Sequence, residues 1–424
     1  VVNLLDLGGG TLDREAVADL ALDVVQGLGL AGNDLADTQH DGGEAAFDHV
    51  RRLVLGEGKC GVRDLGIDDQ GGLNIAQVYL ARHRVTHAVK AVELRLARNG
   101  FELVHLGHQN LQSDTIVDGH IIDLNHVSDV INRIWTDHGI RTQQVATAIS
   151  GHAVIVKKIL LPQMSTEELD EQIQWEAEQY IPFDINDVNL YHEVVGTDPQ
   201  AGQMEVMLVA CKRDKIAQFT QVISQAGKQP VIVDVDAFAL QNAYEINYTP
   251  PPNLTVALLD IGASVMTLNI VRGTNSIFTR DVSAGGNQYT DLLQKEMNLT
   301  FEHAEALKRG VATEDGVTPE DALPSIQAVT DMLSLEVQRT LDFFRATASS
   351  EATQIDRMLL SGGSSKVAGL TDSLAERFGI PIERFDAFRN IGFDRKKVDE
   401  EYLREMSPNM AIAVGLASRI AEDR

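Results

Sequence analysis

The chain has 424 residues, with 62 acidic and 36 basic side chains and a formal net charge of −26. This surplus of negative charge argues against nucleic acid and against an anionic membrane surface as partners, because both attract basic patches. The length allows two domains with substantial cores, and no apolar run approaches the roughly 20 residues that span a bilayer, so we expect no direct membrane insertion.

Residues 1–85 differ in composition from the rest of the chain. They contain no Pro, Met or Trp and are rich in Gly, Asp, Leu and Val. Leu5–Asp13 (LDLGGGTLD) resembles a phosphate loop of DnaK-type chaperones, but too few residues precede it to form a buried strand, and we interpret it as a chance match. The segment is an atypical extension with three open origins: a helical extension, a small separate domain, or out-of-frame sequence joined to a gene. Its composition favours the last.

The remainder of the chain has the pattern of a mixed α/β protein. Apolar and polar residues alternate over Ala88–Leu96, a turn is expected at Arg98–Gly100, and a second strand returns over Phe101–Gly107. Apolar residues at helical spacing predict a helix over Asp123–His138. Two more strands, at 145–150 and 153–161, follow it.

An insertion with its own helix and strands is predicted over residues 165–213. Its helix begins with the capping-box sequence Ser165–Glu168. The aromatic residues Trp175, Tyr180 and Phe183 cluster here, in a chain with 5% aromatic residues. Two interpretations remain open: these side chains pack the core of a small α+β lobe, or they line, together with Ile181, a groove for an apolar peptide.

Two aspartates follow in the next strand and helix. Pro230–Leu240 predicts a buried strand that carries Asp234 and Asp236 and leads into a helix. If this turn faces a phosphate-binding loop, one of the two carboxylates, with Asp236 as our choice, can hold a Mg²⁺-bound or attacking water. The alternative is that one or both of them cap the helix.

Thr255–Ser264 (TVALLDIGAS) is the most informative stretch. A buried strand ends in Asp260, whose charge needs a cation, water or hydrogen-bond donors, and Gly262 lets an anion approach the backbone amides. We predict that Asp260, Gly262, Ala263 and Ser264 hold a phosphate and its Mg²⁺; an ordinary strand end is the alternative. Strands at 266–271 and 276–281 and a helix at 287–297 complete a unit that resembles the second phosphate loop of the actin-like superfold. The same meander followed by a helix begins the earlier part of the chain, which predicts two halves on one plan.

A third candidate site lies further along the chain. Glu305 and Lys308 share one face of a predicted helix, and Gly362 and Gly363 follow a buried strand. Paired glycines let a flat ring or a ribose approach the backbone, and a glutamate can accept hydrogen bonds from ribose hydroxyls. We predict that these four residues bind the nucleoside.

Residues 87–424 resemble the PilM family, the actin-like proteins of type IV pilus assembly, which are related in fold to FtsA and MreB. The segments that carry the resemblance are His87–Leu94, Gly151–Pro162, Gln174–Asp184, Asp234–Tyr244, Leu259–Gly262 and Leu360–Gly363. The resemblance implies an α/β, actin-like ATPase fold, with two duplicated halves around a nucleotide cleft and an inserted small α+β lobe called 1C. The domains expected are lobe 1A over 86–164 and 214–249, lobe 1C over 165–213, and lobe 2A over 253–424 with a small 2B insertion around 298–350.

The resemblance also implies a function. ATP and Mg²⁺ are expected in the cleft, with nucleotide binding rather than efficient turnover. The expected partners are the N-terminal cytoplasmic peptide of the inner-membrane protein PilN and other proteins of the pilus inner-membrane subcomplex. The protein is therefore expected in the cytoplasm, peripheral to the inner membrane through its partners. A small-molecule kinase on the actin superfold is the alternative; it requires a general base such as Asp234 or Asp236.

The sequence departs from the family at one important place. The first phosphate loop of the family, an Asp-Ile-Gly-Ser-like run, is expected just before His87. The residues there are Ala81–Thr86 (ARHRVT), with His83 in the position of the aspartate and no glycine. Either half of the phosphate site is lost, or the residues before about 86 are not native.

Overall fold

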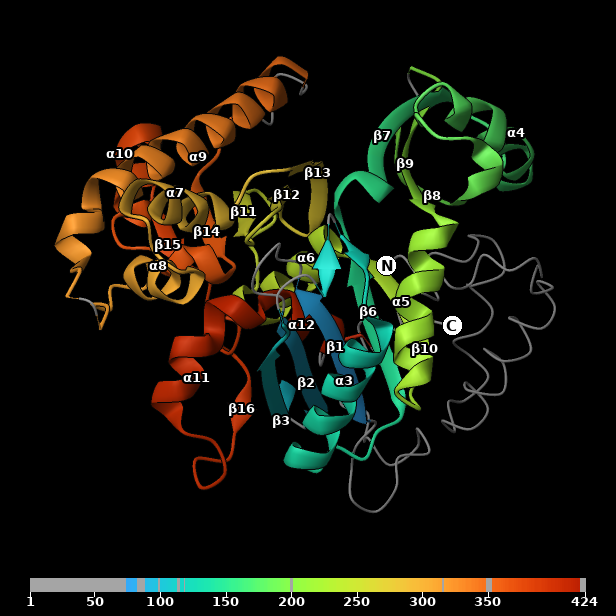
Figure 1. Cartoon of the computed structure of the whole chain (residues 1–424). Coiled ribbons are helices and arrows are strands. Elements are labelled where there is room, and N and C mark those ends of the chain that lie inside the picture. The colour runs from blue at the N-terminus through green and yellow to red at the C-terminus, as the bar shows by residue number, and fades with distance from the viewer. Residues whose placement is uncertain are drawn as a thin grey trace.

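The protein consists of two halves, each built on its own β-sheet, and a smaller inserted lobe (Figure 1). The computed structural model describes residues 74–81, 88–97, 100–112, 115–117, 119–198, 201–314, 316–347 and 353–419.

The first half contains a six-stranded sheet. Its strands in spatial order are β10 (Gln229–Val235), β6 (Gln144–Ile149), β1 (Asn74–Ala81), β2 (Ala88–Ala97), β3 (Gly100–Asn110) and β16 (Gly392–Phe393). β1, β2 and β3 form an antiparallel meander, and β6 and then β10 continue the sheet in parallel on the other side of β1.

The second half repeats this plan in a five-stranded sheet. Its strands in spatial order are β13 (Asn275–Val282), β12 (Met266–Arg272), β11 (Thr255–Ile261), β14 (Arg357–Ser361) and β15 (Ile382–Arg384). β11 to β13 form the antiparallel meander, and β14 and β15 add in parallel. The same strand order in both sheets confirms the predicted duplication, and the fold is actin-like.

The position of β1 corrects one predicted boundary. Residues 74–81 were included in the atypical extension, but they form the strand that pairs antiparallel with β2 and parallel with β6. β1 is therefore the counterpart of β11 in the first half. Its loop, at the place of the expected first phosphate loop, lies outside the described residues, as does most of the expected extension.

Helices cover the sheets and fill the space between them. α3 (Leu124–His138) and α5 (Arg213–Gln225) pack on one face of the first sheet, and the short strands β4 (Ile116–Val117) and β5 (His120–Ile121) precede α3. α6 (Asp236–Tyr248) and α12 (Ala411–Ala417) share one core with both sheets. Gly415 permits the contact between these two helices, because a Cβ at this position would lie 1.6 Å from the carbonyl oxygen of Ala239.

The outer face of the second sheet carries a layer of helices. They are α7 (Asn287–Met297), α8 (Phe301–Lys308), α9 (Pro319–Thr347) and α10 (Leu370–Phe378). All four share the core of this sheet, so the segment around 298–350, predicted as a 2B insertion, forms part of that layer. α11 (Glu400–Met406) lies between the last strand and α12.

The inserted lobe is a three-stranded sheet with one helix. The strands in spatial order are β7 (Val154–Pro162), β9 (Gln203–Lys212) and β8 (Val188–Asp198), and α4 (Thr166–Glu178) covers one face. The predicted capping box is present: the amide of Glu168 donates to the Ser165 hydroxyl, and the Ser165 amide donates to the Glu168 carboxylate. The lobe begins with β7, ahead of the boundary expected at residue 165, because β7 pairs with β9 rather than with the first sheet.

Candidate functional site

Asp260 lies at the end of β11, where its sheet faces the other half. The parallel register of β11 and β14 places Ser361 beside it, and the Ser361 hydroxyl donates to Asp260 Oδ1 at 2.8 Å. Burial raises the pKa of the Asp260 carboxyl, while the hydrogen bond from Ser361 and the charge of Lys90 act in the opposite direction. The Ser361 hydrogen bond thus fixes the position of the carboxylate, and its buried negative charge would be stabilised further by a cation.

Lys90 of β2 is the residue of the first half that faces this carboxylate. Its side chain is 7% exposed, and Nζ donates to the carbonyl oxygen of Asn409 at 2.7 Å. Burial lowers the pKa of Lys90 to about 8, although the negative charge of Asp260 partly opposes the shift. His108, its register partner on β3, has a pKa lowered to about 4 by burial and by the charge of Lys90. Lys90 therefore places a positive charge close to the carboxylates of Asp260 and Asp236.

The loop after β11 packs against the start of α7. The amide of Gly286 donates to the carbonyl oxygen of Gly262 at 3.0 Å, and the amide of Asn287 donates to that of Ala263 at 2.8 Å. A Cβ on Gly285 would lie 2.6 Å from the Ala263 backbone. Glycine is therefore required for the two segments to approach so closely. The sequence predicted the helix at 287–297, but no local pattern indicated that the glycines before it contact this loop.

Gly362 and Gly363 follow β14 at the same edge of the sheet. Gly362 has φ +86°, and a Cβ there would lie 2.3 Å from the carbonyl oxygen of Ile261. At Gly363 an added Cβ would meet nothing within 4 Å, so there is open space beside it. The next residue, Ser364, donates its hydroxyl to the Gly262 carbonyl oxygen at 3.0 Å. The predicted glycine pair thus lies against the loop that follows Asp260.

The predicted pair Glu305 and Lys308 joins the same assembly through α8. Lys308 Nζ donates to the Thr290 hydroxyl at 3.0 Å and to the Gly286 carbonyl oxygen at 3.4 Å, and it forms an ion pair with Glu305. The Thr290 hydroxyl also donates to Glu305. Burial lowers the pKa of Lys308, and the Glu305 carboxylate raises it in part. Three segments that are distant in the sequence therefore meet around the end of β11.

The two aspartates at the end of β10 have different environments. Asp234 forms an ion pair with Arg419, with Oδ2 2.7 Å from Nη1 and both side chains 1% exposed. Asp236 begins α6 but makes no side-chain cap; its Oδ2 accepts a hydrogen bond from the Ser150 hydroxyl at 2.5 Å. The charge of Asp236 also acts on Lys90. Of the two, Asp236 is therefore the carboxylate near Lys90.

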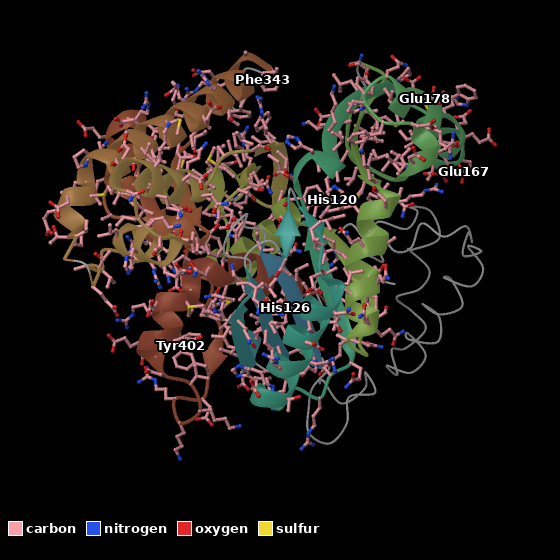
Figure 2. All side chains as sticks on the ribbon, in the orientation of Figure 1. His120, His126, Glu167, Glu178, Phe343 and Tyr402 are labelled. Carbon is pink, nitrogen blue, oxygen red and sulfur yellow. The ribbon has the colours of Figure 1, made fainter. Side chains whose placement is uncertain are left out.

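The four residues predicted to bind a partner occupy different layers of the inserted lobe. Trp175 is 74% exposed on the solvent side of α4, the helix that carries Glu167 and Glu178 on the outside of the lobe (Figure 2). Ile181 is 5% exposed and belongs to the lobe core.

The other two predicted partner residues pack against that core from its edge. Tyr180 lies under the Lys157 ammonium and Phe183 under that of Lys212, each at 4.4 Å from the ring centroid. The cluster predicted from the sequence is thus divided between core and surface.

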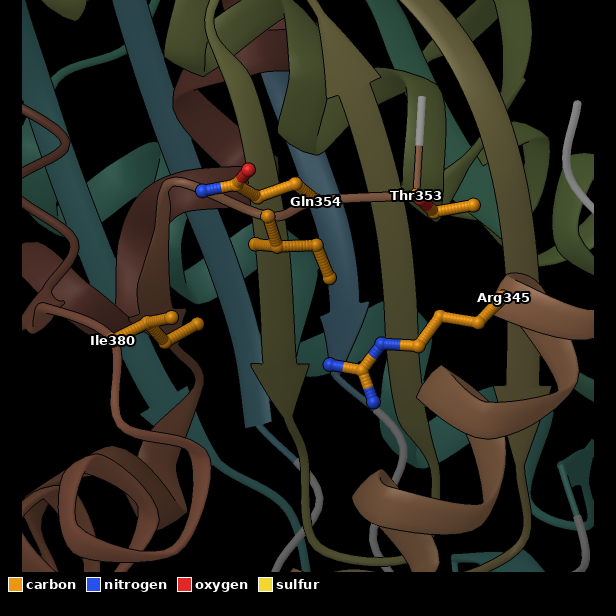
Figure 3. Close-up of a pocket in the computed structure, with 5 residues that line it drawn as sticks. Arg345, Thr353, Gln354 and Ile380 are labelled. Carbon is orange, nitrogen blue, oxygen red and sulfur yellow. The ribbon is translucent and has the colours of Figure 1, made fainter. Parts of the chain in front are cut away.

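A pocket in the second half lies away from all these residues. Arg345, Thr353, Gln354, Ile355 and Ile380 line it (Figure 3). Three of them immediately precede β14 and therefore lie at its amino end, whereas Asp260 faces the carboxyl end of this strand. The pocket is separate from the candidate site.

Comparisons with known proteins agree with this architecture. A family model described as type IV pilus assembly protein PilM matches residues 85–421. A solved PilM–PilN type IV pilus biogenesis complex aligns with a TM-score of 0.72 and 28% identity, over 81% of this chain and 97% of that chain.

Two further solved structures align at lower similarity. The ethanolamine utilization protein EutJ from Carboxydothermus hydrogenoformans has a TM-score of 0.49 and 12% identity, over 84% of this chain and 95% of that chain. MreB5 of Spiroplasma citri bound to AMPPNP has a TM-score of 0.42 and 13% identity, over 80% of this chain and 94% of that chain. Among the described residues, no helix is long and apolar enough to cross a membrane.

Proposed function

The chain belongs to the PilM family of type IV pilus assembly proteins, and we propose that it is a scaffold that binds ATP between its halves and the N-terminal peptide of PilN on its inserted lobe. The observation that carries the proposal is the likeness of this chain, over most of its length, to a PilM–PilN complex. The small-molecule kinase is not favoured, because the family is one of pilus assembly and Asp234, one of its two candidate bases, is engaged by Arg419.

The residues around Asp260 fit a nucleotide with its Mg²⁺. Mg²⁺ is usually held by one or two carboxylates together with phosphate oxygens and waters, and Asp260 and Asp236 would supply the carboxylates. Among the described residues no three His, Cys, Asp or Glu side chains form a metal site of their own. The bound ion would neutralise phosphate charge.

Each of the other residues would take a separate part in binding. Ala263 and Ser264 would offer backbone amides to the phosphates, and Lys90 would add a positive charge from the other half. Gly262 would form the tight turn that holds these amides in place, because its own amide donates to the Val265 carbonyl oxygen at 3.0 Å. The open space at Gly363 would admit the flat part of the nucleoside. Because the Glu305 carboxylate is already engaged by Lys308 and Thr290, this pair would shape the wall of the nucleoside site.

We place the peptide on the face of the inserted sheet that α4 leaves uncovered. Strand alternation directs Ile159 and Leu161 into the core under α4 and Leu160 to the other face, where it is 60% exposed. Further along this face, Met207 and Val209 share a core with the first half. An apolar, extended peptide would therefore meet both the inserted lobe and the first half. Through this peptide the protein would be held at the inner membrane, beside other proteins of the pilus subcomplex.

The test is a titration of a labelled N-terminal PilN peptide into the wild type and two variants. Leu160→Glu places a charge on the proposed face, and Trp175→Ala removes the exposed ring on the opposite side of the lobe. We expect Leu160→Glu to weaken binding about 30-fold, the effect of losing a hot-spot contact of about 2 kcal/mol, and Trp175→Ala to change it little.

Circular dichroism confirms the fold of each variant. A loss confined to Trp175→Ala would move the peptide site to α4, and no binding to any of the three proteins would overturn the proposed function. Ile181 is unsuitable for this test, because a charge at this core position would unfold the lobe.

A further inference from the structure

The connection between β6 and β7 contacts three parts of the molecule within four residues. It consists of Ser150 and the short 3₁₀ turn Gly151–Ala153, and β7, the first strand of the inserted lobe, begins directly after it. β7 also contacts β13 of the second half, and the two strands lie side by side between the lobes (Figure 1). The first half, the second half and the inserted lobe therefore meet at this connection.

Two hydrogen bonds tie the connection to the second half. The amide of Gly151 donates to Asp281 Oδ2 at 2.5 Å, while the Thr267 hydroxyl donates to Asp281 Oδ1 at 2.7 Å. One residue further on, His152 Nε2 lies 2.6 Å from the Ser283 hydroxyl. Gly151 has φ +78°, a conformation that suits glycine, and in it the amide reaches the carboxylate. An amide bound to an ionised carboxylate makes a hydrogen bond stronger than a neutral one.

The same connection reaches the candidate nucleotide site from both sides. The Ser150 hydroxyl donates to Asp236 Oδ2, so the residue next to Gly151 holds the carboxylate of the first half. In the second half, the charge of Asp281 raises the pKa of Asp260. A few residues after Asp281, Gly286 packs on the loop that follows Asp260. Opening or closing of the cleft would therefore change the contacts of residues 150–153.

We propose that residues 150–153 and Asp281 form a clamp between the halves, which closes the cleft around the nucleotide and fixes β7. Because β7 is an edge strand of the sheet to which we assign the PilN peptide, the clamp couples nucleotide release to peptide affinity. This inference rests on the proposed function and adds the residues through which its two sites communicate. Asp281 is a positioning residue in this account, since it acts through the Gly151 amide.

The test compares Asp281→Asn with the matched control Asp342→Asn. Asparagine keeps the shape of Asp281 but has one acceptor oxygen for two donors, Thr267 and Gly151. Asp342 undergoes the same change on the exposed side of α9, where its Oδ1 accepts hydrogen bonds from Gln338 at 2.7 Å and from Arg345 at 3.2 Å. His152→Ala removes the second contact and serves as an independent variant if Asp281→Asn does not fold.

Three measurements report on the clamp. Amide hydrogen exchange at Gly151, followed without nucleotide, should become about tenfold faster in Asp281→Asn, which corresponds to about 1.4 kcal/mol. Dissociation of a fluorescent ATP analogue with Mg²⁺ should accelerate by a similar factor. The ratio of peptide affinities with and without ATP should move toward one, whereas Asp342→Asn should match the wild type in all three.

The outcomes separate the clamp from the function on which it rests. If exchange, dissociation and the affinity ratio are all the same in Asp281→Asn and in the wild type, the clamp is overturned while the two binding sites stand. If the wild type binds neither the analogue nor the peptide, the proposed function is overturned, and so is the proposed coupling between nucleotide and peptide binding. The exchange measurement then still decides whether Asp281 holds the two halves together.

Discussion

Lys90 and Asp260 act on each other's protonation across the two halves of the molecule. The negative charge of Asp260 raises the pKa of Lys90 against the effect of burial, and the positive charge of Lys90 lowers that of Asp260. One residue belongs to β2 and the other to β11, so the pair exists only when both sheets are folded and face each other. Both charges are largely removed from water, and a phosphate with its metal would offer each of them a counter-charge.

The first prediction concerns the carboxylate of this pair. We expect Asp260→Asn to weaken Mg²⁺-dependent ATP binding by about tenfold or more and to leave the fold intact, because asparagine keeps the shape and an acceptor for Ser361. Calorimetric titration with and without Mg²⁺ measures the effect. Loss of folding in place of loss of Mg²⁺ dependence would mean that Asp260 is a structural strand end.

The second prediction is a pH dependence that arises from Lys90. Because the pKa of Lys90 is about 8 in the folded protein, its charge is lost as the pH rises through this value. The affinity for ATP should therefore decrease above pH 8, by up to about tenfold per pH unit. Lys90→Met should remove this dependence, and Lys158→Met, on the inserted lobe, should retain it. An affinity that is constant from pH 7 to 9.5 in the wild type would contradict the prediction.

The same shift affects stability in a defined direction. The ordinary lysine pKa is 10.5, so between about 8 and 10.5 the unfolded chain binds a proton at Lys90 that the folded protein has released. The contribution of Lys90 to the free energy of unfolding therefore increases with pH in this window. Denaturant unfolding of the wild type and Lys90→Met at several pH values isolates this contribution.

The third prediction distinguishes the two neighbouring aspartates. Asp234→Asn leaves the buried Arg419 guanidinium without its carboxylate and should lower the free energy of unfolding by about 3–5 kcal/mol. Glu205→Gln removes the exposed pair with Lys158 and should cost about 1 kcal/mol or less. Urea unfolding measures both. Equal costs would show that the Asp234–Arg419 pair contributes no more than a surface pair.

The elements that could be predicted from the sequence are those whose pattern is local. The strand ending at Asp260, the capping box at Ser165 and the helix bearing Glu305 each follow from a short run of residues, and the structure has all three. Ser361 and Lys90 could not be assigned to the site in this way. Their positions depend on strand register and on the packing of two sheets, which no short run encodes.

Further differences between the predictions and the structure also have physical causes. β7 was predicted as a strand, but alternation does not specify which sheet a strand joins. The position of Trp175 could have been predicted, since Leu169, Ile173 and Ala177 define the buried face of α4 and Trp175 lies off it. Lys90 could have been noticed as a candidate site residue because it is a lysine near the start of a mostly apolar strand, β2.

The fourth prediction follows from β1. Residues 1–85 were predicted to be an atypical extension, but the structure places Asn74–Ala81 between β2 and β6. A chain that begins at residue 82 should therefore lose the central strand of the first sheet and unfold at a temperature lower by many degrees. Thermal melting by circular dichroism measures this. An unchanged melting temperature would show that β1 is dispensable for the first half.

The last prediction contrasts two glycine-to-alanine changes. At Gly415 the new methyl group would lie 1.6 Å from the carbonyl oxygen of Ala239, so α12 and α6 must separate. Such overpacking costs about 1–3 kcal/mol or more, and Gly415→Ala should lower the free energy of unfolding accordingly. At Gly363 nothing lies within 4 Å of the added methyl group, so Gly363→Ala should leave stability nearly unchanged. Because that space is where we place the nucleoside, Gly363→Ala should instead weaken ATP binding. Urea unfolding and nucleotide titration of both variants provide the comparison, and a Gly363→Ala protein that binds ATP as the wild type does would remove Gly363 from the nucleotide site.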